Sequence, residues 1–247
     1  MDALLIAQQL SDVSQTNELF NNLAPPLQIA LFLGALSLFT AILVSVTAFT
    51  RIVIVLSFIR RALATQEIPP NPVLLGLSVF LTIFVMAPTL EAINEKGIQP
   101  FLAWQNSTED EPAPEFGYVK LWEVTSAELK TFMLSNTRPS DLQLFSELSK
   151  NGTESESVYE QESTSVPLQV VIPAFIISEL KTAFIMGFCL YIPFLLIDLV
   201  VSTILMSLGM MMMPPVVVST PCKLLLFVLV DGWQLLTRAL VSSFHMV

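Results

Sequence analysis

The stretch that decides the fold is IPFLLIDLVVSTILMSLGMMMMPP, at residues 192–215. It is apolar almost throughout, and Asp198 is its only charged residue. Together with its flanks, it gives two uncharged runs, at residues 182–197 and 199–222. About 20 apolar residues are needed for a helix to cross the ~30 Å apolar core of a bilayer. The stretch therefore predicts a pair of membrane-inserted helices with a turn near Asp198.

Two further uncharged runs, at residues 27–50 and 73–90, precede this pair, and the second ends near Pro88. The 247-residue chain is 53% hydrophobic and only 13% charged, with a mean hydropathy of +0.70, whereas a soluble domain carries about 25% charged residues. The sequence therefore predicts an all-α integral membrane protein of two helical hairpins, built from four hydrophobic segments, with a small helical subdomain outside the membrane.

The charges between the runs predict the orientation of the chain. The segment at residues 51–72 holds three arginines against one acid, whereas residues 91–181 hold six Lys or Arg against 15 Asp or Glu. Basic residues in short loops favour the cytoplasmic side, so the first segment is expected to be a cytoplasmic loop and the second to be periplasmic. The expected division is an N-terminal periplasmic segment (1–26), a first hairpin (27–90), an acidic periplasmic region (91–170) and a second hairpin with a Met-rich loop and a C-terminal helix (171–247).

Two capping boxes predict a pair of short helices within residues 125–150. In each box a Ser or Thr is followed three residues later by Glu or Gln, as in Thr125–Glu128 and Ser140–Gln143. The apolar faces expected to be buried are Leu129, Phe132 and Met133 in the first helix, and Leu144, Phe145 and Leu148 in the second. The acidic flanks of this subdomain, which carry the N-x-Thr sequons at Asn106 and Asn151, predict mobile linkers.

Several charged residues lie within or beside the apolar runs: Arg51, Glu179, Lys181, Asp198, Lys223 and Asp231. A charge at the centre of a bilayer costs about 2.5–3.5 kcal/mol on insertion scales, so each requires a partner, an aqueous face or a helix end at the interface. Glu179 and Lys181 are two residues apart and therefore point to different helical faces, which favours an assembly in which they meet different neighbours. The sequence predicts that Glu179 pairs with Lys223 of an adjacent subunit.

The residue types expected of an enzyme or a metal protein are scarce. The chain has two cysteines, Cys189 and Cys222, and a single histidine, His245, which cannot form a Cys/His metal cluster. No nucleotide-binding, hydrolase or metalloprotease motif is present, and a net charge of −10 disfavours nucleic-acid binding. We therefore expect no metal, no cofactor and no enzymatic activity. The first residues, MDALLIAQQLSD, lack the basic region of a signal peptide, so either none is made or one has been removed.

Five blocks of this sequence resemble the FliP family of flagellar type III export-gate proteins, whose injectisome relatives share them. The blocks are TRIVIVLSFIRRALATQEIPPN (50–71), FLTIFVMAP (80–88), IPAFIISELKTAF (172–184), IPFLLIDLVVSTILMSLGMMMMPP (192–215) and KLLLFVLVDGWQLL (223–236). FMLSNTRPSDLQLF (132–145) in the outer subdomain also resembles that family. The resemblance covers roughly two thirds of the chain, in order.

The resemblance implies a homo-pentamer that joins the small gate proteins FliQ and FliR, and further export-apparatus and basal-body proteins, in the bacterial inner membrane. It implies a channel for unfolded export substrates, in a flagellar basal body or in an injectisome. In such assemblies the hairpins are lifted into a core of protein–protein contacts. The resemblance also implies that Met210, Met211 and Met212, with Met213 as an additional member, form a methionine constriction of the export path.

Two alternatives stay open at this point. Methionine fills irregular apolar space readily, so the methionine run could serve packing alone. The charges and broken helices are also compatible with a self-contained small-solute transporter or ion channel, although no internal repeat supports it.

Overall fold

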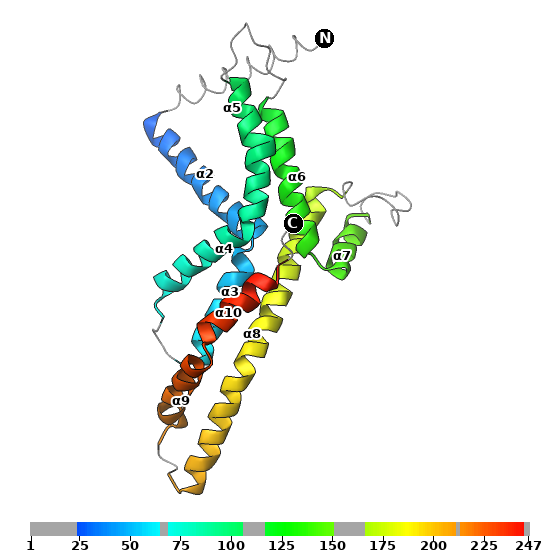
Figure 1. The fold of residues 1–247 in the computed structure, drawn as a ribbon. Helices are drawn as coiled ribbons and strands as arrows, with labels where there is room; N and C mark the ends of the chain where they lie inside the picture. Colours follow the sequence, from blue (N-terminus) through cyan, green and yellow to red (C-terminus); the bar gives the residue numbers. More distant parts are fainter. Residues whose placement is uncertain (1–23, 65–68, 106–116, 151–165, 211–212, 245–247) are drawn as a thin grey trace, which may run out of the picture. The chain divides into compact units, whose positions relative to one another are not determined.

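The computed structural model describes residues 24–64, 69–105, 117–150, 166–210 and 213–244. Every regular element within these ranges is a helix (Figure 1), which confirms the predicted all-α fold class. The chain forms two compact units, Met1–Leu43 and Val44–Val247. The expected linkers around Asn106 and Asn151 lie outside the described residues.

Helix α2 (Pro25–Val46) supplies most of the described part of the first unit, which ends at Leu43. It contains no charged residue, and two prolines open it, at a position where a missing N–H group costs no helical hydrogen bond. Its apolar side chains are largely exposed, as Phe32 at 64% and Leu38 at 65% show. A helix that is apolar on all sides suits a surrounding of lipid or of other membrane helices.

The core of the second unit forms where α3 (Phe49–Ala62) packs along α8 (Leu168–Ser207). Ile52, Val55, Leu56 and Ile59 recur at helical spacing on α3 and are at most 2% exposed. They belong to one apolar cluster with residues of α8 such as Phe175. The first twelve residues of the expected loop at residues 51–72 are therefore helical instead, because the apolar stripe of α3 packs against α8. The cytoplasmic side of this segment stays a prediction.

Helix α4 (Asn71–Ile93) continues through a π-helical turn, η1 (Asn94–Ile98), into α5 (Gln99–Gln105). The uncharged run ends near Pro88, but the helix does not, because Pro88 lies inside α4. Proline removes one backbone hydrogen bond, but a helix continues past it when neighbours hold the chain. Here the flanking residues Met86, Thr89 and Ile93 are all buried, so packing outweighs that loss.

Helices α6 (Tyr118–Asn136) and α7 (Pro139–Lys150) form the outer subdomain, and both contact α8. The predicted helix start at Thr125 is wrong, because α6 begins at Tyr118, whose ring packs 5.1 Å from that of Phe101 on α5. Helix α7 begins at Pro139, so Ser140 lies inside its first turn.

The two predicted apolar faces of this subdomain have different outcomes. Phe132 and Met133 of α6 are buried at 1% each, as expected. In α7 the expectation is wrong for Leu144 and Leu148, which are 48% and 58% exposed in this chain. The buried residue of α7 is Asp141 instead, whose Oδ1 atom lies 3.8 Å from Nζ of Lys181 on α8.

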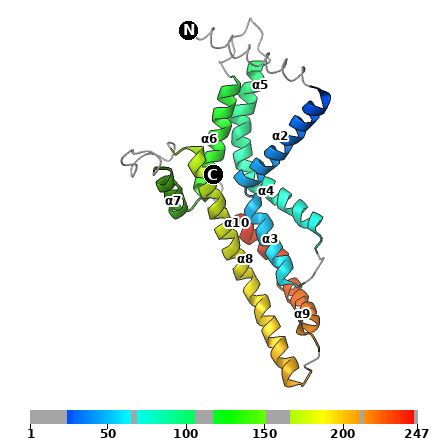
Figure 2. The ribbon, with the colours of Figure 1, turned by 180° about the vertical axis from the view of Figure 1, so that it is seen from behind.

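The predicted turn near Asp198 is also wrong. Helix α8 runs 40 residues through Asp198 and contains Pro173 and Pro193, and the chain reverses only after Ser207. Gly209 has φ +75°, a left-handed conformation that glycine adopts without strain and that commonly ends helices. Helix α9 (Pro215–Leu229) then returns along α8 (Figure 2). Helix α10 (Gly232–Ser242) follows it (Figure 1), and the two helices are bent by 66°.

Among the described residues three helical segments are long and apolar enough to cross a membrane, Pro25–Val46, Asn71–Gln105 and Leu168–Ser207. The bent pair α9 and α10 would make a fourth if it counts as one span. At 1.5 Å per residue the 40 residues of α8 extend about 60 Å, twice the ~30 Å apolar core of a bilayer. A large part of α8 must therefore lie outside the lipid or inside a protein assembly.

Candidate functional site

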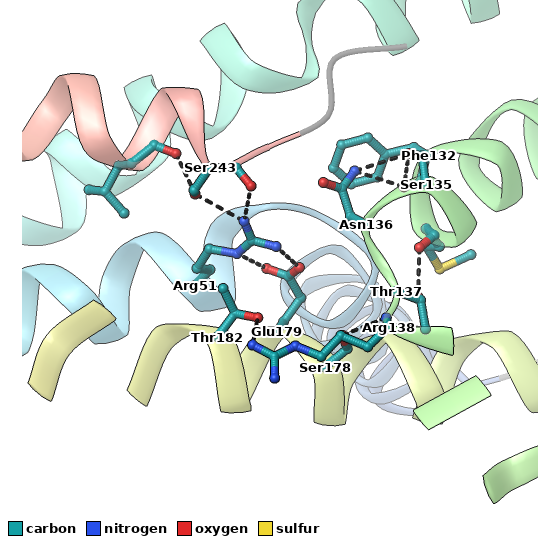
Figure 3. A network of polar contacts seen from close by, with 12 residues as sticks. Arg51, Phe132, Ser135, Asn136, Thr137, Arg138, Ser178, Glu179, Thr182 and Ser243 are labelled. Carbon is teal, nitrogen blue, oxygen red and sulfur yellow. Dashed lines mark hydrogen bonds and ion pairs between the residues drawn. The ribbon is translucent and has the colours of Figure 1, made fainter. Parts of the chain in front are cut away.

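An ion pair between Arg51 of α3 and Glu179 of α8 lies at the centre of the second unit (Figure 3). Arg51 Nε donates to one carboxylate oxygen of Glu179 at 2.7 Å, and Nη2 donates to the other. The two residues are 2% and 0% exposed. This two-bond arrangement matches the planar fork of guanidinium to a carboxylate, a geometry that lysine cannot reproduce. Both charges are therefore neutralised within the chain.

The remaining side of the guanidinium binds the C-terminal end of α10. Arg51 Nη1 donates to the backbone carbonyl of Ser243 at 2.7 Å and to its hydroxyl at 3.0 Å. The guanidinium carbon also lies 3.8 Å from the centroid of the Phe244 ring, a cation–π contact. Arg51 thus joins three elements, α3, α8 and the end of α10. Sequence reasoning missed Ser243 and Phe244, because a contact across 192 positions leaves no local pattern.

The turn between α6 and α7 docks onto α8 next to this pair (Figure 3). The backbone N–H of Arg138 donates to the hydroxyl of Ser178 at 2.9 Å, and its guanidinium donates to Thr182 at 3.1 Å. Lys181 Nζ lies 3.8 Å from Asp141 Oδ1, with its side chain 51% exposed. Lys181 therefore faces α7 while its neighbour Glu179 faces α3.

A second ion pair crosses the α8–α9 hairpin. Lys223 Nζ donates to Asp198 Oδ2 at 2.6 Å, and the two side chains are 3% and 35% exposed. The other oxygen of Asp198 is buried and has no hydrogen-bond partner among the described residues. This pair explains how α8 continues through Asp198, since the charge is compensated across the hairpin instead of marking a turn.

The structure does not bring Glu179 and Lys223 of one chain together. Arg51 is the partner of Glu179 and Asp198 is the partner of Lys223. A single chain does not test the pairing of Glu179 with Lys223 of an adjacent subunit, so that pairing stays a prediction. The alternative is that both charges are paired within one chain, as Arg51–Glu179 and Asp198–Lys223 are here.

The methionine run lies at the tip of the α8–α9 hairpin. Met210 is 42% exposed and Met213 is 38% exposed, whereas Met211 and Met212 lie outside the described residues. The N–H of Met210 donates to the carbonyl of Leu205 at 3.1 Å, which closes the last turn of α8. The start of the run is therefore fixed by a helix end, and the thioether side chains of Met210 and Met213 are exposed in this chain.

Asp231 occupies the break between α9 and α10, with φ 51° and ψ 48°. It is exposed, and no side-chain hydrogen bond of its own caps α10. Within the described ranges no group of three or more His, Cys, Asp or Glu residues is arranged to hold a metal ion.

These features define a class of protein: an all-α membrane protein whose internal charges are paired across packed helices and whose longest hairpin carries methionines at its tip. The chain belongs to the FliP family, since the sequence model of that family matches residues 32–240.

Several curated relatives bear the description flagellar biosynthetic protein FliP. The protein of Cereibacter sphaeroides is 49% identical over 88% of this chain and 67% of its own length. That of Bacillus subtilis is 47% identical over 90% of this chain and 94% of its own length. That of Aquifex aeolicus is 44% identical over 91% of this chain and 88% of its own length.

Proposed function

We propose that this protein serves in flagellar biosynthesis as a core channel component of the type III protein export gate. Its family and the names of its relatives support the flagellar role. The proposed site is the bacterial inner membrane, within the flagellar basal body, and the proposed cargo is unfolded export substrate. The region at residues 91–170, with α6 and α7, is proposed to lie in the periplasm.

The protein acts in this proposal as a homo-pentamer together with FliQ and FliR. The length of α8 supports an assembly, because this helix is about twice as long as the apolar core of the bilayer is thick. Its exposed side chains such as Phe188 at 60% and Leu199 at 61% are suited to contact other subunits.

The observation that carries the proposal is the methionine run at the hairpin tip. In a ring, each subunit contributes one tip, so that Met210, Met211, Met212 and Met213 converge on the axis. Unbranched thioether side chains adapt to irregular space, and a narrow apolar constriction excludes ions by dewetting. Such a gasket closes the empty channel and also seals around an export substrate that passes through it.

The test replaces Met210, Met211 and Met212 with Ala in the assembled complex. Ion leak across the inner membrane is expected to rise while the oligomer still forms, because every subunit loses side-chain volume at the same level. The control is Val228→Ala with Leu229→Ala, which removes apolar side chains that are 70% and 71% exposed at the other end of α9. Unchanged conductance in the triple variant would overturn the gasket. A protein that purifies without an oligomer and transports a small solute alone would overturn the channel assignment.

A further inference from the structure

The bend between α9 and α10 lies at the Asp231–Gly232 pair, a dipeptide that favours a break in a helix. Asp231 adopts a left-handed conformation, which aspartate tolerates better than most non-glycine residues but which a continuous right-handed helix does not contain. The sequence LLLFVLVDGWQLL around it contains no proline, which would otherwise account for a sharp break. Together the two helices also have the length and apolarity of one membrane span.

Contacts outside the bend hold both helices in place. On α9, Lys223 binds Asp198 of α8 at 2.6 Å, and Phe227 packs 6.3 Å from Phe194 of α8. On the far side of the bend, Leu236 and Leu240 of α10 are at most 2% exposed. Each helix is thus fixed to the rest of the unit independently of the other.

The C-terminal end of α10 is held by Arg51. The carbonyl and hydroxyl of Ser243 accept hydrogen bonds from its guanidinium, and the ring of Phe244, which is 6% exposed, stacks against it. Because the same guanidinium binds Glu179 with its other edge, the position of α10 is tied to the packing of α3 on α8.

The inner side of the bend is closely packed as well. A Cβ atom on Gly232 would lie 2.3 Å from the ring of Phe227, and that ring meets Trp233 edge-on at 5.2 Å. Only glycine allows this approach, so residue 232 is suited to the bent arrangement. In a straight helix a glycine at this place would serve no packing purpose and would weaken the helix.

We propose that α9 and α10 form a two-state joint, in which Arg51 is the clamp that holds the bent state. When Arg51 binds Ser243 and Phe244, the pair of helices α9 and α10 is bent at Asp231. When the clamp is released and α10 leaves its packing against the unit, α9 and α10 align into one helix over residues 215–242. This helix is about 42 Å long at 1.5 Å per residue, long enough to cross a bilayer. Residues 215–242 thus form one membrane-spanning helix before the second unit packs, and two helices with a bend between them afterwards.

The joint is tested by a distance measured within one chain. Spin labels at Val217 of α9 and Ala239 of α10, both exposed, would be about 33 Å apart along a straight helix and about 28 Å apart with the 66° bend. The labelled full-length chain has Cys189 and Cys222 replaced by Ser. It is diluted into unlabelled chains of the membrane complex, so that the spectrum reports one chain only.

A matched pair of substitutions at the bend separates strain from simple flexibility. Asp231→Gly tolerates the left-handed conformation and is expected to keep the shorter distance. Asp231→Ala favours a continuous right-handed helix and is expected to shift at least half of the population to the longer distance. Equal distances in the two variants would overturn the claim that the conformation of residue 231 decides the bend.

The clamp is tested separately from the ion pair. Phe244→Ala removes the ring stacked on Arg51 and leaves Glu179 paired, so that the unit still folds while the longer distance gains population. Leu235→Ala, at an exposed position of α10 (56%), is the control and is expected to leave the distance unchanged. A wild-type distance near 33 Å, or a Phe244→Ala distance identical to wild type, would overturn the clamp. This readout does not depend on ion conduction, so its result stands whether or not the methionine gasket exists.

Discussion

Lys223 and Asp198 form an ion pair whose two members differ in exposure, at 3% and 35% for the side chains. Removing one partner of a buried pair leaves the other charge uncompensated, at a cost of about 3–5 kcal/mol, whereas replacing both is often nearly neutral. The ammonium of Lys223 stays buried in the chain once Asp198 is gone. The side chain of Asp198 keeps its partial exposure once Lys223 is gone, although its Oδ1 atom is buried. The two single substitutions should therefore differ in severity.

We expect Asp198→Leu to destabilise the purified complex by about 3 kcal/mol or more and Lys223→Met to destabilise it clearly less. The double variant Asp198→Leu/Lys223→Met should regain most of the stability lost by Asp198→Leu. Thermal unfolding of the complex in mild detergent provides the measurement. Equal losses in the two single variants, with no recovery in the double variant, would mean that the pair is not the reason why Lys223 is tolerated at this depth.

The sequence singles out these charged residues but does not indicate the partners that they have within this chain. Arg51, Glu179, Asp198 and Lys223 attract attention because each interrupts an apolar run. Which of them pair depends on which helices pack side by side. Arg51 and Glu179 are separated by 128 positions in the sequence, so no local sequence pattern indicates that their helices pack together. Residue type therefore predicts that a charge needs a partner, while tertiary structure alone selects the partner.

The packing of α3 on α8 depends on a glycine. A Cβ atom on Gly187 would lie 2.5 Å, 2.6 Å and 3.1 Å from three carbons of Phe58. The third of these is the Cβ of Phe58 itself, so rotating the ring cannot relieve the overlap. Phe58 also meets Phe184 edge-on at 5.7 Å, which restricts it further. The two helices must therefore separate to admit any larger side chain.

We expect Gly187→Ala to destabilise the protein by about 1–3 kcal/mol, the usual cost of overpacking, and to lower the yield of the assembled complex. Gly76→Ala in α4 is the matched control, since a Cβ there meets nothing within 4 Å and alanine favours the helix. Protease resistance of the membrane-embedded protein and its thermal stability give the comparison. A Gly187→Ala variant as stable as Gly76→Ala would show that the interface yields more easily than its geometry indicates.

At the scale of helices, the apolar runs predicted where helices occur but not where they end. A turn was expected near Asp198 and an uncharged run ends near Pro88, yet α8 and α4 continue through these residues. In each case a neighbouring element compensates the local defect, by burial around Pro88 and by Lys223 across from Asp198. The true end of α8 is set by Gly209 and the prolines after the methionine run, where nothing compensates.

At the scale of the whole molecule, the fold class followed from composition, because few charges and long apolar runs admit little other than membrane helices. The association of chains does not follow from one chain. The buried charges could be satisfied within a chain, as Arg51–Glu179 and Lys223–Asp198 are here, or between chains, as Glu179 with Lys223 of a neighbour. These two arrangements predict different outcomes for the same set of charge exchanges.

Arg51 binds both carboxylate oxygens of Glu179. We therefore expect the single variants Arg51→Glu and Glu179→Arg each to lose the oligomer, and the double variant to recover part of it. Native gels provide the measurement. A buried pair broken on one side costs about 3–5 kcal/mol, and in a ring that loss repeats in every subunit, so the single variants should abolish assembly. The exchange Glu179→Lys/Lys223→Glu should give no recovery if the pairs lie within the chain, because it leaves Arg51 beside a lysine and Asp198 beside a glutamate. Recovery by this second exchange alone, together with disulfide formation between subunits when Cys replaces Glu179 and Lys223, would establish the pairing between chains and contradict the intrachain pairs as the basis of assembly.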